Sequence, residues 1–425
     1  MITDNHFSIR DKMIEAIVKG NLDIIIFLHK NGCPLDKDMC IYAAKFAHIN
    51  CLKYLYENGC PWDRYVCATA ALNGNIECLK YAYENGCPCD EHMCRNAAEN
   101  GHLECLKYLH EIGCSWDSCV CTFAVLYGNL NCLKYAHENG CPWDKDTCDN
   151  AAEYGYLECL KYAHENGCHW DSWVCTLAAS NGHLDCLKYA HENGCPWSLD
   201  TCSWAARFGH LDCLKYAHEN GCPWSSLVCN YAVSENYIDC LKYAHENGCL
   251  WNEHTCIVAG KNGNLECLKY LHENGCPWDR KACTFSAING HLNCLRYLHE
   301  NGCPWDEKTC YYAAMNGHFD CLKYAHENGC PWCISTCNFA IVRNHLDCLK
   351  YAYENGCPYP NEFLSTIVKK ILIPKWRDSV KIRPIIYYWM ERSVQTSCAE
   401  NGRARNEDIN SFENDFNNLY EKVII

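Results

Sequence analysis

The sequence lacks any long apolar run, and it lacks an excess of positive charge. No stretch is long and apolar enough to cross a bilayer, and the opening residues MITDNHFSIRDK mix charged, polar and apolar side chains, unlike an export signal. The 37 Lys and Arg against 52 Asp and Glu give a formal net charge of −15, which argues against a general electrostatic attraction to nucleic acid or anionic lipid. We therefore expect a cytoplasmic protein with neither nucleic acid nor membrane as a partner.

Signatures of catalysis are missing too. The sequence contains no glycine-rich phosphate loop, no nucleophile elbow and no HExxH string. Its chemically reactive residues come in a string that recurs along the chain, for example CLKYAHENGCPWD at 132–144. We expect no enzyme, no catalytic residue and no cofactor, so the string needs a structural explanation first.

Cysteine is abundant, with 41 residues that follow a strict pattern. One column recurs every 27 residues from Cys51 to Cys348, a second lies nine residues later, from Cys33 to Cys357, and a third lies seven residues further on, from Cys40 to Cys337. A fixed period of this size is typical of a solenoid, in which stacked units bury each other's apolar faces. The cysteines outside the columns are Cys89, Cys119, Cys333 and Cys398.

Each unit predicts two short helices, as residues 306–332 illustrate. Asp306 is a good N-cap for a first helix that ends at Gly317, and a second helix over 319–328 ends at Gly329. The tryptophan before the cap predicts a hydrophobic staple with the third-column cysteine, as between Trp62 and Cys67. The cap position is filled by Asp36, Asp63, Asp90, Asp117, Asp144, Asp171, Ser198, Ser225, Asn252, Asp279 and Asp306.

The string AAMNGHFDCLKYAHENG at 313–329 resembles the ankyrin repeat, with its N-G-H turn and its second helix of the form L-E-V-V-K-L-L-L-E-x-G. The resemblance covers residues 9 to about 359. It implies an all-α, ankyrin-like α-solenoid of about 13 helix-turn-helix units. Ankyrin units usually span 33 residues, so units of 27 imply that the β-hairpin fingers are reduced or absent. Short, cysteine-rich units of this kind look most similar to ankyrin proteins of amoeba-infecting giant DNA viruses, which implies a host cytoplasmic or virion location.

The pattern divides the chain into three parts. Residues 1–35 are expected to form an N-terminal capping repeat, with Met13 and Ile24 in cysteine positions, and residues 36–359 form twelve repeats. Residues 360–425 are expected to form a C-terminal cap and tail. ILIPKWRDSV at 371–380 matches weakly the F-box-like segments with which viral ankyrin proteins often end, and a cap followed by an amphipathic helix explains this region better.

The cysteine and histidine columns have metal, disulfide and packing interpretations. The cysteine spacings do not match the CxxC-like pairs of zinc sites, so we expect no metal. Equivalent cysteines of neighbouring units lie about 10 Å apart, too far for a disulfide. Reduced thiols are therefore expected, and pairs between different columns stay open. Tyr56, Tyr83 and Tyr353 replace histidine in its first column, which favours surface packing over metal binding, with a pH-responsive stripe as the minor alternative.

The first helix of each unit also contains positions that vary freely while the frame repeats. In ankyrins this helix lines the concave face, so the resemblance implies a groove for a protein partner, and neutral drift on a solvated face is the alternative. The predicted function is a non-enzymatic protein-protein interaction scaffold. The alternatives are a virion structural component, possibly disulfide-linked, and a ubiquitin-ligase substrate adaptor; the oligomeric state is open. The candidate partner-binding residues are Tyr65, Arg95, Phe123, Trp173, Trp204, Arg207, Lys261, Lys281 and Tyr311.

Overall fold

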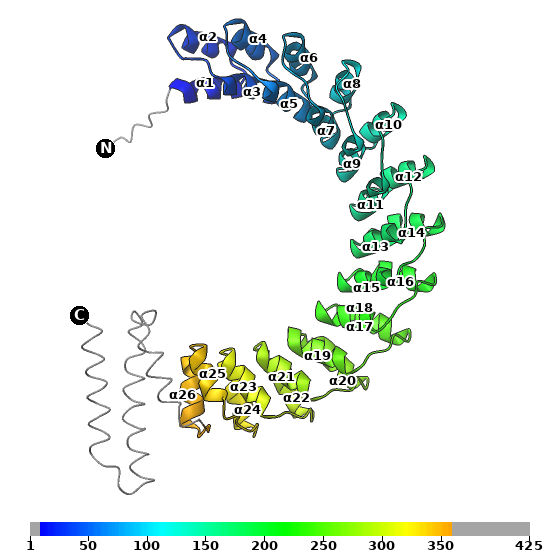
Figure 1. Cartoon of the computed structure of the whole chain (residues 1–425), viewed down its shortest axis with the longest axis vertical. Helices are drawn as coiled ribbons and strands as arrows, with labels where there is room; N and C mark the ends of the chain where they lie inside the picture. Colours follow the sequence, from blue (N-terminus) through cyan, green and yellow to red (C-terminus); the bar gives the residue numbers. More distant parts are fainter. Residues whose placement is uncertain (1–8, 359–425) are drawn as a thin grey trace, which may run out of the picture. The chain divides into compact units, whose positions relative to one another are not determined.

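The computed structural model describes residues 9–358, and every regular element in that range is an α-helix (Figure 1). The all-α prediction without β-hairpin fingers is confirmed for these residues. None of their helices is long and apolar enough to cross a membrane. The helices are α1 (Ile9–Val18), α2 (Leu22–Lys30), α3 (Lys37–Lys45), α4 (Ile49–Glu57), α5 (Arg64–Leu72), α6 (Ile76–Glu84), α7 (Glu91–Glu99), α8 (Leu103–Glu111), α9 (Ser118–Leu126), α10 (Leu130–Glu138), α11 (Lys145–Glu153), α12 (Leu157–Glu165), α13 (Ser172–Ser180), α14 (Leu184–Glu192), α15 (Leu199–Arg207), α16 (Leu211–Glu219), α17 (Leu227–Ser234), α18 (Ile238–Glu246), α19 (Glu253–Asn262), α20 (Leu265–Glu273), α21 (Arg280–Ile288), α22 (Leu292–Glu300), α23 (Glu307–Met315), α24 (Phe319–Glu327), α25 (Thr336–Val342) and α26 (Leu346–Glu354).

The chain forms two compact units, which divide between Thr309 and Cys310. In the first unit the odd-numbered helices pack side by side in one layer and the even-numbered helices form a second layer (Figure 1). Fully buried alanines such as Ala70 and Ala71 let the odd-numbered helices approach closely. This layer lies on the concave side of the first unit, and we call the exposed surface of α3 to α21 in this layer the inner face. In the second unit α26 packs against α24 and α25.

The helices begin and end where capping chemistry predicts. The side chain of Asp63 accepts a 3.0 Å hydrogen bond from the backbone N–H of Tyr65, which satisfies a donor that has no partner within the helix. Gly317 and Gly329 follow their helices with φ of 77° and 86°, a left-handed conformation that favours glycine. The same N-cap bond forms at Asp36, Asp63, Asp90, Asp117, Asp144, Asp171, Ser198, Ser225, Asn252, Asp279 and Asp306.

The turn between the two helices of a repeat binds the repeat before it. The Nε2 atom of His102 lies 3.1 Å from the backbone oxygen of Leu72, at the end of α5. The imidazole also lies against Gly74, where a Cβ atom would stand 2.5 Å from His102 Nδ1. Where asparagine fills the position, as at Asn75, its amide donates to the oxygen of Ala44 at 2.7 Å. These bonds satisfy backbone carbonyls at the C-terminal end of each first helix, which have no partner within the helix.

The tryptophans pack differently from the prediction. The indole of Trp62 stacks on the ring of Tyr56, with centroids 3.8 Å apart, and Trp143 stacks on His137 at 3.6 Å. Each indole therefore covers the second helix of the preceding repeat, so the ring on which Trp62 stacks is Tyr56, a partner that the predicted staple with Cys67 did not include. The histidine column lies in this stack, which agrees with the surface-packing interpretation.

The cysteine columns form the core, as predicted. The thiol of Cys60 donates to the backbone oxygen of Asp36 at 3.0 Å, and it also receives a hydrogen bond from the thiol of Cys40. Buried thiols of this kind act as small apolar groups that also satisfy loop carbonyls. The hydrogen-bonded thiol pairs are Cys40–Cys60, Cys67–Cys87, Cys121–Cys141, Cys148–Cys168, Cys175–Cys195, Cys202–Cys222, Cys229–Cys249, Cys256–Cys276, Cys310–Cys330 and Cys337–Cys357.

One disulfide corrects the expectation that all thiols are reduced. Cys89 and Cys114 are bonded, with Cα atoms 6.3 Å apart. The distance argument applied to equivalent cysteines of neighbouring repeats, whereas this bond joins a cysteine outside the columns to a second-column cysteine. Both residues flank the same helical pair, α7 and α8, so this disulfide closes one repeat.

The structure describes the N-terminal hairpin but not the C-terminal region. Within the described range α1 and α2 form the first hairpin, and Ile24 is 46% exposed where the equivalent Cys51 is 1% exposed. That exposure fits a hairpin that no described repeat precedes. The division into residues 1–35, 36–359 and 360–425 stays a prediction. The predicted C-terminal cap and tail at 360–425 lies outside the described residues.

Candidate protein-binding face

On each helix of the inner face, one side carries residues that repeat from unit to unit and the other side carries residues that vary. In α13, Val174, Cys175, Ala178 and Ala179 are buried against neighbouring helices. Trp173 projects from the same helix and is 40% exposed. The helical period places the repeated small residues on the stacking side and the variable ones toward solvent. The variable positions of successive helices therefore meet on one surface.

An aromatic cluster lies at the centre of this surface. The rings of Trp173 on α13 and Trp204 on α15 meet edge to face, with centroids 6.2 Å apart at 76°. Phe208 follows α15, is 43% exposed and lies 5.8 Å from Trp204. The guanidinium of Arg207 lies 5.6 Å from the Trp204 ring, 5.8 Å from Phe208 and 5.3 Å from Tyr231. We define the aromatic cluster as Trp173, Trp204, Arg207, Phe208 and Tyr231.

The cluster is held in place before any partner arrives. Each cation–π contact of Arg207 contributes about 0.5–1 kcal/mol at a partly exposed site. Edge-to-face aromatic pairs contribute a similar amount beyond the area they bury. A surface whose side chains are already ordered loses less conformational entropy on binding.

The sequence predicted three members of this cluster and missed Phe208 and Tyr231. Phe208 occupies a C-cap position at which Asn73, Asn100 and Asn181 stand in other repeats. Phe46, Tyr127 and Tyr154 also occupy this position in other repeats, so an aromatic residue there did not by itself single out Phe208.

The remaining predicted residues fall into separate groups. The guanidinium of Arg95 lies 5.0 Å from the Phe123 ring, which joins α7 to α9. Tyr65 lies under the guanidinium of Arg64, at 5.3 Å. Tyr311 belongs to the second unit, where its ring lies 5.2 Å from Phe339. Two further residues, Lys261 on α19 and Lys281 on α21, are exposed, and among the described residues no ring contact links them to these groups.

A buried carboxylate lies one helix before Trp173. Asp149 on α11 is 9% exposed, and its Oδ1 atom has no hydrogen-bond partner. Burial raises the pKa of Asp149 to about 6, and Lys145, whose Nζ atom lies 3.9 Å from Oδ2, opposes that rise. The inner face therefore carries a carboxyl group whose charge changes near neutral pH.

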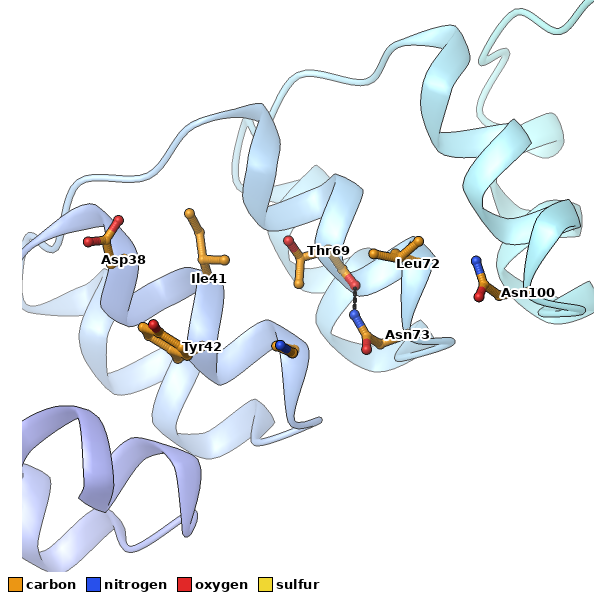
Figure 2. A pocket seen from close by; sticks show the side chains of 8 residues that line it. Asp38, Ile41, Tyr42, Thr69, Leu72, Asn73 and Asn100 are labelled. Atoms are coloured by element: carbon orange, nitrogen blue, oxygen red, sulfur yellow. Dashed lines mark hydrogen bonds between the residues drawn. The ribbon is translucent and has the colours of Figure 1, made fainter. Parts of the chain in front are cut away.

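A shallow depression of about 550 Å³ lies further toward the N-terminus of the inner face (Figure 2). The amide of Asn73 donates to the backbone oxygen of Thr69 at 2.8 Å, and Asp38 pairs with Arg10 at 2.8 Å. Two of its polar side chains are thus bonded within the protein itself. Its lining residues are Asp38, Ile41, Tyr42, Lys45, Thr69, Leu72, Asn73 and Asn100.

Metal ligands do not converge in the part of the chain that the structure describes. No group of three or more His, Cys, Asp or Glu side chains between residues 9 and 358 has the geometry to hold a metal ion.

Comparisons with known proteins point to one family. A model of three-copy ankyrin repeats matches residues 40–118, 229–309 and 255–335, and a model of multiple ankyrin repeats matches residues 148–191. The crystal structure of the human ASB11 ankyrin repeat domain is similar at 20% identity, with a TM-score of 0.34, over 37% of this chain and 84% of that one. No curated protein matches the sequence.

Proposed function

The chain belongs to the ankyrin repeat proteins, and from this premise we propose that it is a non-enzymatic scaffold that binds a protein partner on its inner face. Ankyrin repeats in general support protein-protein interaction. The finer proposal is that the contact centres on the aromatic cluster between α13 and α17.

The single observation that carries this proposal is the cluster's composition and exposure. Trp173 and Phe208 are 40% and 43% exposed although the repeat frame needs neither ring. Tryptophan, tyrosine and arginine dominate the residues that contribute most to binding at protein interfaces. Large exposed apolar groups gathered in one place are typical of interaction sites, whereas isolated ones need no explanation.

The partner's chemistry follows from what the surface offers. A partner that covers Trp173 and Phe208 has to present apolar or aromatic side chains to them. Lys145, at 3.9 Å, only partly compensates the Asp149 carboxylate, and a basic side chain of the partner that reaches Asp149 would complete the compensation. We therefore propose a partner segment with apolar residues flanked by a basic one.

The proposal can be tested with substitutions that copy the residues at equivalent positions of other repeats, because such residues are compatible with the packing of the repeats. Histidine, asparagine and serine occupy the equivalent positions at His92, Asn150 and Ser180. The triple variant Trp173→His, Trp204→Asn, Arg207→Ser should therefore stack normally and lose the partner. Lys242→Ala, on the exposed surface of α18 in the other layer, is the matched control and should keep it.

The readout is quantitative capture from native cells, followed by a dissociation constant measured with the purified partner. The proposal predicts a protein that the wild type and the Lys242→Ala variant retain and the triple variant releases. Equal retention by all three proteins would place the contact elsewhere.

The two alternative functions gain no support from the described residues. A cross-linked virion component needs disulfides between chains, and the Cys89–Cys114 bond lies within one repeat. The segment that suggested a ubiquitin-ligase adaptor, residues 371–380, lies outside the described residues.

A further inference from the structure

The repeat that contains α7 and α8 departs from its neighbours at one position. From Trp62 onward the other repeats carry a tryptophan before the N-cap, and that indole stacks on the preceding second helix, as Trp116 does on His110 with centroids 4.0 Å apart. Before α7 this position holds Cys89. No indole therefore covers Tyr83, and the loop is tied by the Cys89–Cys114 disulfide instead.

Cys114 also has a second cysteine in its neighbourhood. In other repeats the second-column thiol accepts a hydrogen bond from the third-column thiol twenty residues earlier, and that bond lowers the pKa of Cys87 and Cys141. Cys94 occupies this donor position in α7 and is fully buried. Burial raises the pKa of Cys94 to about 12, so its thiol stays protonated and able to donate.

We propose that Cys89, Cys94 and Cys114 form a thiol–disulfide exchange site that reacts with low-molecular-weight thiols. Cys89 is partly exposed, whereas Cys114 is buried at 6% exposure, so the two sulfurs are not equally open to attack. Cys89 is the sulfur that an incoming thiolate reaches, and Cys114 is the sulfur that leaves.

The exchange balances in two steps. A thiolate attacks Cys89, the Cys89–Cys114 bond breaks, and its electron pair moves to the Cys114 sulfur, which takes up a proton. The product is a mixed disulfide between Cys89 and the small thiol. A second thiolate attacks the small thiol's sulfur, releases Cys89 as a thiol and leaves with the first as a small-molecule disulfide. The two small thiols are oxidised and the protein disulfide is reduced.

Cys94 acts as a positioning residue in this reaction. In the preceding repeat the thiol at this position, Cys67, lowers the pKa of Cys87. A donor beside a leaving sulfur stabilises the thiolate that forms, and the proposal gives Cys94 that role toward Cys114. After reduction Cys94 and Cys114 form the same thiol pair as the other repeats, while the loop before α7 loses its tie. No other second-column cysteine has this possibility, because its counterpart of Cys89 is Trp or, before Cys33 and Cys60, Ser8 and Leu35.

The test uses the full chain equilibrated in glutathione buffers of decreasing potential. The reaction is quenched with acid, the chain is denatured, and the free thiols are then alkylated and located by mass spectrometry. We expect Cys89 and Cys114 to become alkylated together as the potential falls, with the glutathione adduct on Cys89. Separate alkylation of the two residues at every potential, or an adduct on Cys114 in place of Cys89, would overturn the proposal.

Single substitutions distinguish a role of these cysteines in the exchange reaction from a role in packing. Cys89→Trp restores the common residue and should abolish the disulfide. Cys94→Ala should slow reduction by glutathione about tenfold because the leaving sulfur loses its donor. Cys94→Ser keeps a donor and should react near the wild-type rate, and Cys67→Ala makes the same deletion one repeat earlier. Equal rates for Cys94→Ala and Cys67→Ala, with circular dichroism showing both folded, would remove Cys94 from the mechanism.

Discussion

The imidazole of His137 lies flat against the indole of Trp143, with centroids 3.6 Å apart, and its Nδ1 atom lies 3.1 Å from the hydroxyl of Tyr162 in the next repeat. This three-residue contact joins consecutive helices of the even-numbered layer. It gives a packing reason for the joint recurrence of histidine, tryptophan and tyrosine. Comparable hydrogen bonds form at His110, His164, His218, His245, His272 and His326.

Removal of the hydroxyl tests the energy of this contact. Tyr162→Phe should lower the free energy of unfolding by about 1 kcal/mol, the usual net contribution of a side-chain hydrogen bond. The same substitution at Tyr154, which is 48% exposed, should cost less than about 0.5 kcal/mol. Urea unfolding of the two variants measures the difference, and equal losses would show that the contact contributes nothing.

A buried hydroxyl without a partner predicts a stabilising substitution. Thr147 is fully buried and its Oγ1 atom has no hydrogen-bond partner, whereas the next repeat has the isosteric Val174 in this position. Thr147→Val should raise the free energy of unfolding by about 1 kcal/mol, because an unsatisfied buried hydroxyl costs about that much.

Thr201→Val is the control for that prediction, since the Thr201 hydroxyl lies 3.1 Å from Thr176 Oγ1. This variant should be no more stable than the wild type. Equal stabilisation by both substitutions would indicate a general preference for valine in these helices.

Asp149 predicts a dependence of stability on pH. Its pKa of about 6 in the folded protein lies above the value of about 3.9 in an unfolded chain. Between these values the folded state holds a proton that the unfolded state has lost, so this residue's contribution to stability falls as pH rises from about 4 to 6. Asp149→Asn should therefore be about 1–3 kcal/mol more stable than the wild type at pH 7.5 and equal to it near pH 4. A difference that does not change with pH would contradict this account.

The contact between His102 and Gly74 predicts a coupled pair. Gly74 and Gly59 both have positive φ, of 73° and 79°, but a Cβ atom at Gly59 meets nothing within 4 Å. Gly59→Ala should cost about 1–2 kcal/mol from the backbone conformation alone. Gly74→Ala should cost at least about 1 kcal/mol more, because His102 has to move and lose its bond to Leu72.

A natural pair in the chain suggests how to rescue that variant. Ala47 adopts a φ of 61° at the equivalent position, and the residue that binds its helix end is Asn75. The double variant Gly74→Ala, His102→Asn should recover most of the extra loss. A double variant whose loss is the sum of the two single losses would mean that the residues are not coupled.

The repeat frame could be predicted because it follows from local chemistry. Asp306 and Gly317 cap the two ends of their own helix. The 27-residue spacing of the cysteines was enough to predict that these side chains are buried. The partner of Trp62 was not predictable from its own helix, since it stacks on Tyr56 of the preceding one. The Cys89 disulfide was missed because the distance argument considered only equivalent cysteines.

The aromatic cluster was only partly visible in the sequence. Trp173 and Trp204 are 31 residues apart, which is one repeat of 27 plus one helical turn, so their contact could have been derived from the register. The contribution of Phe208 could not, because it depends on how the chain leaves α15 at the C-cap.

The most direct test of the central claim is the dissociation constant of the captured partner for three proteins. These are the wild type, the Trp173→His, Trp204→Asn, Arg207→Ser variant and the Lys242→Ala control. Loss of interface residues of this kind costs about 2 kcal/mol or more, so the triple variant should bind at least about 30-fold more weakly while the control binds as the wild type does. Binding by the triple variant within about twofold of the wild type would contradict the assignment of function to the inner face.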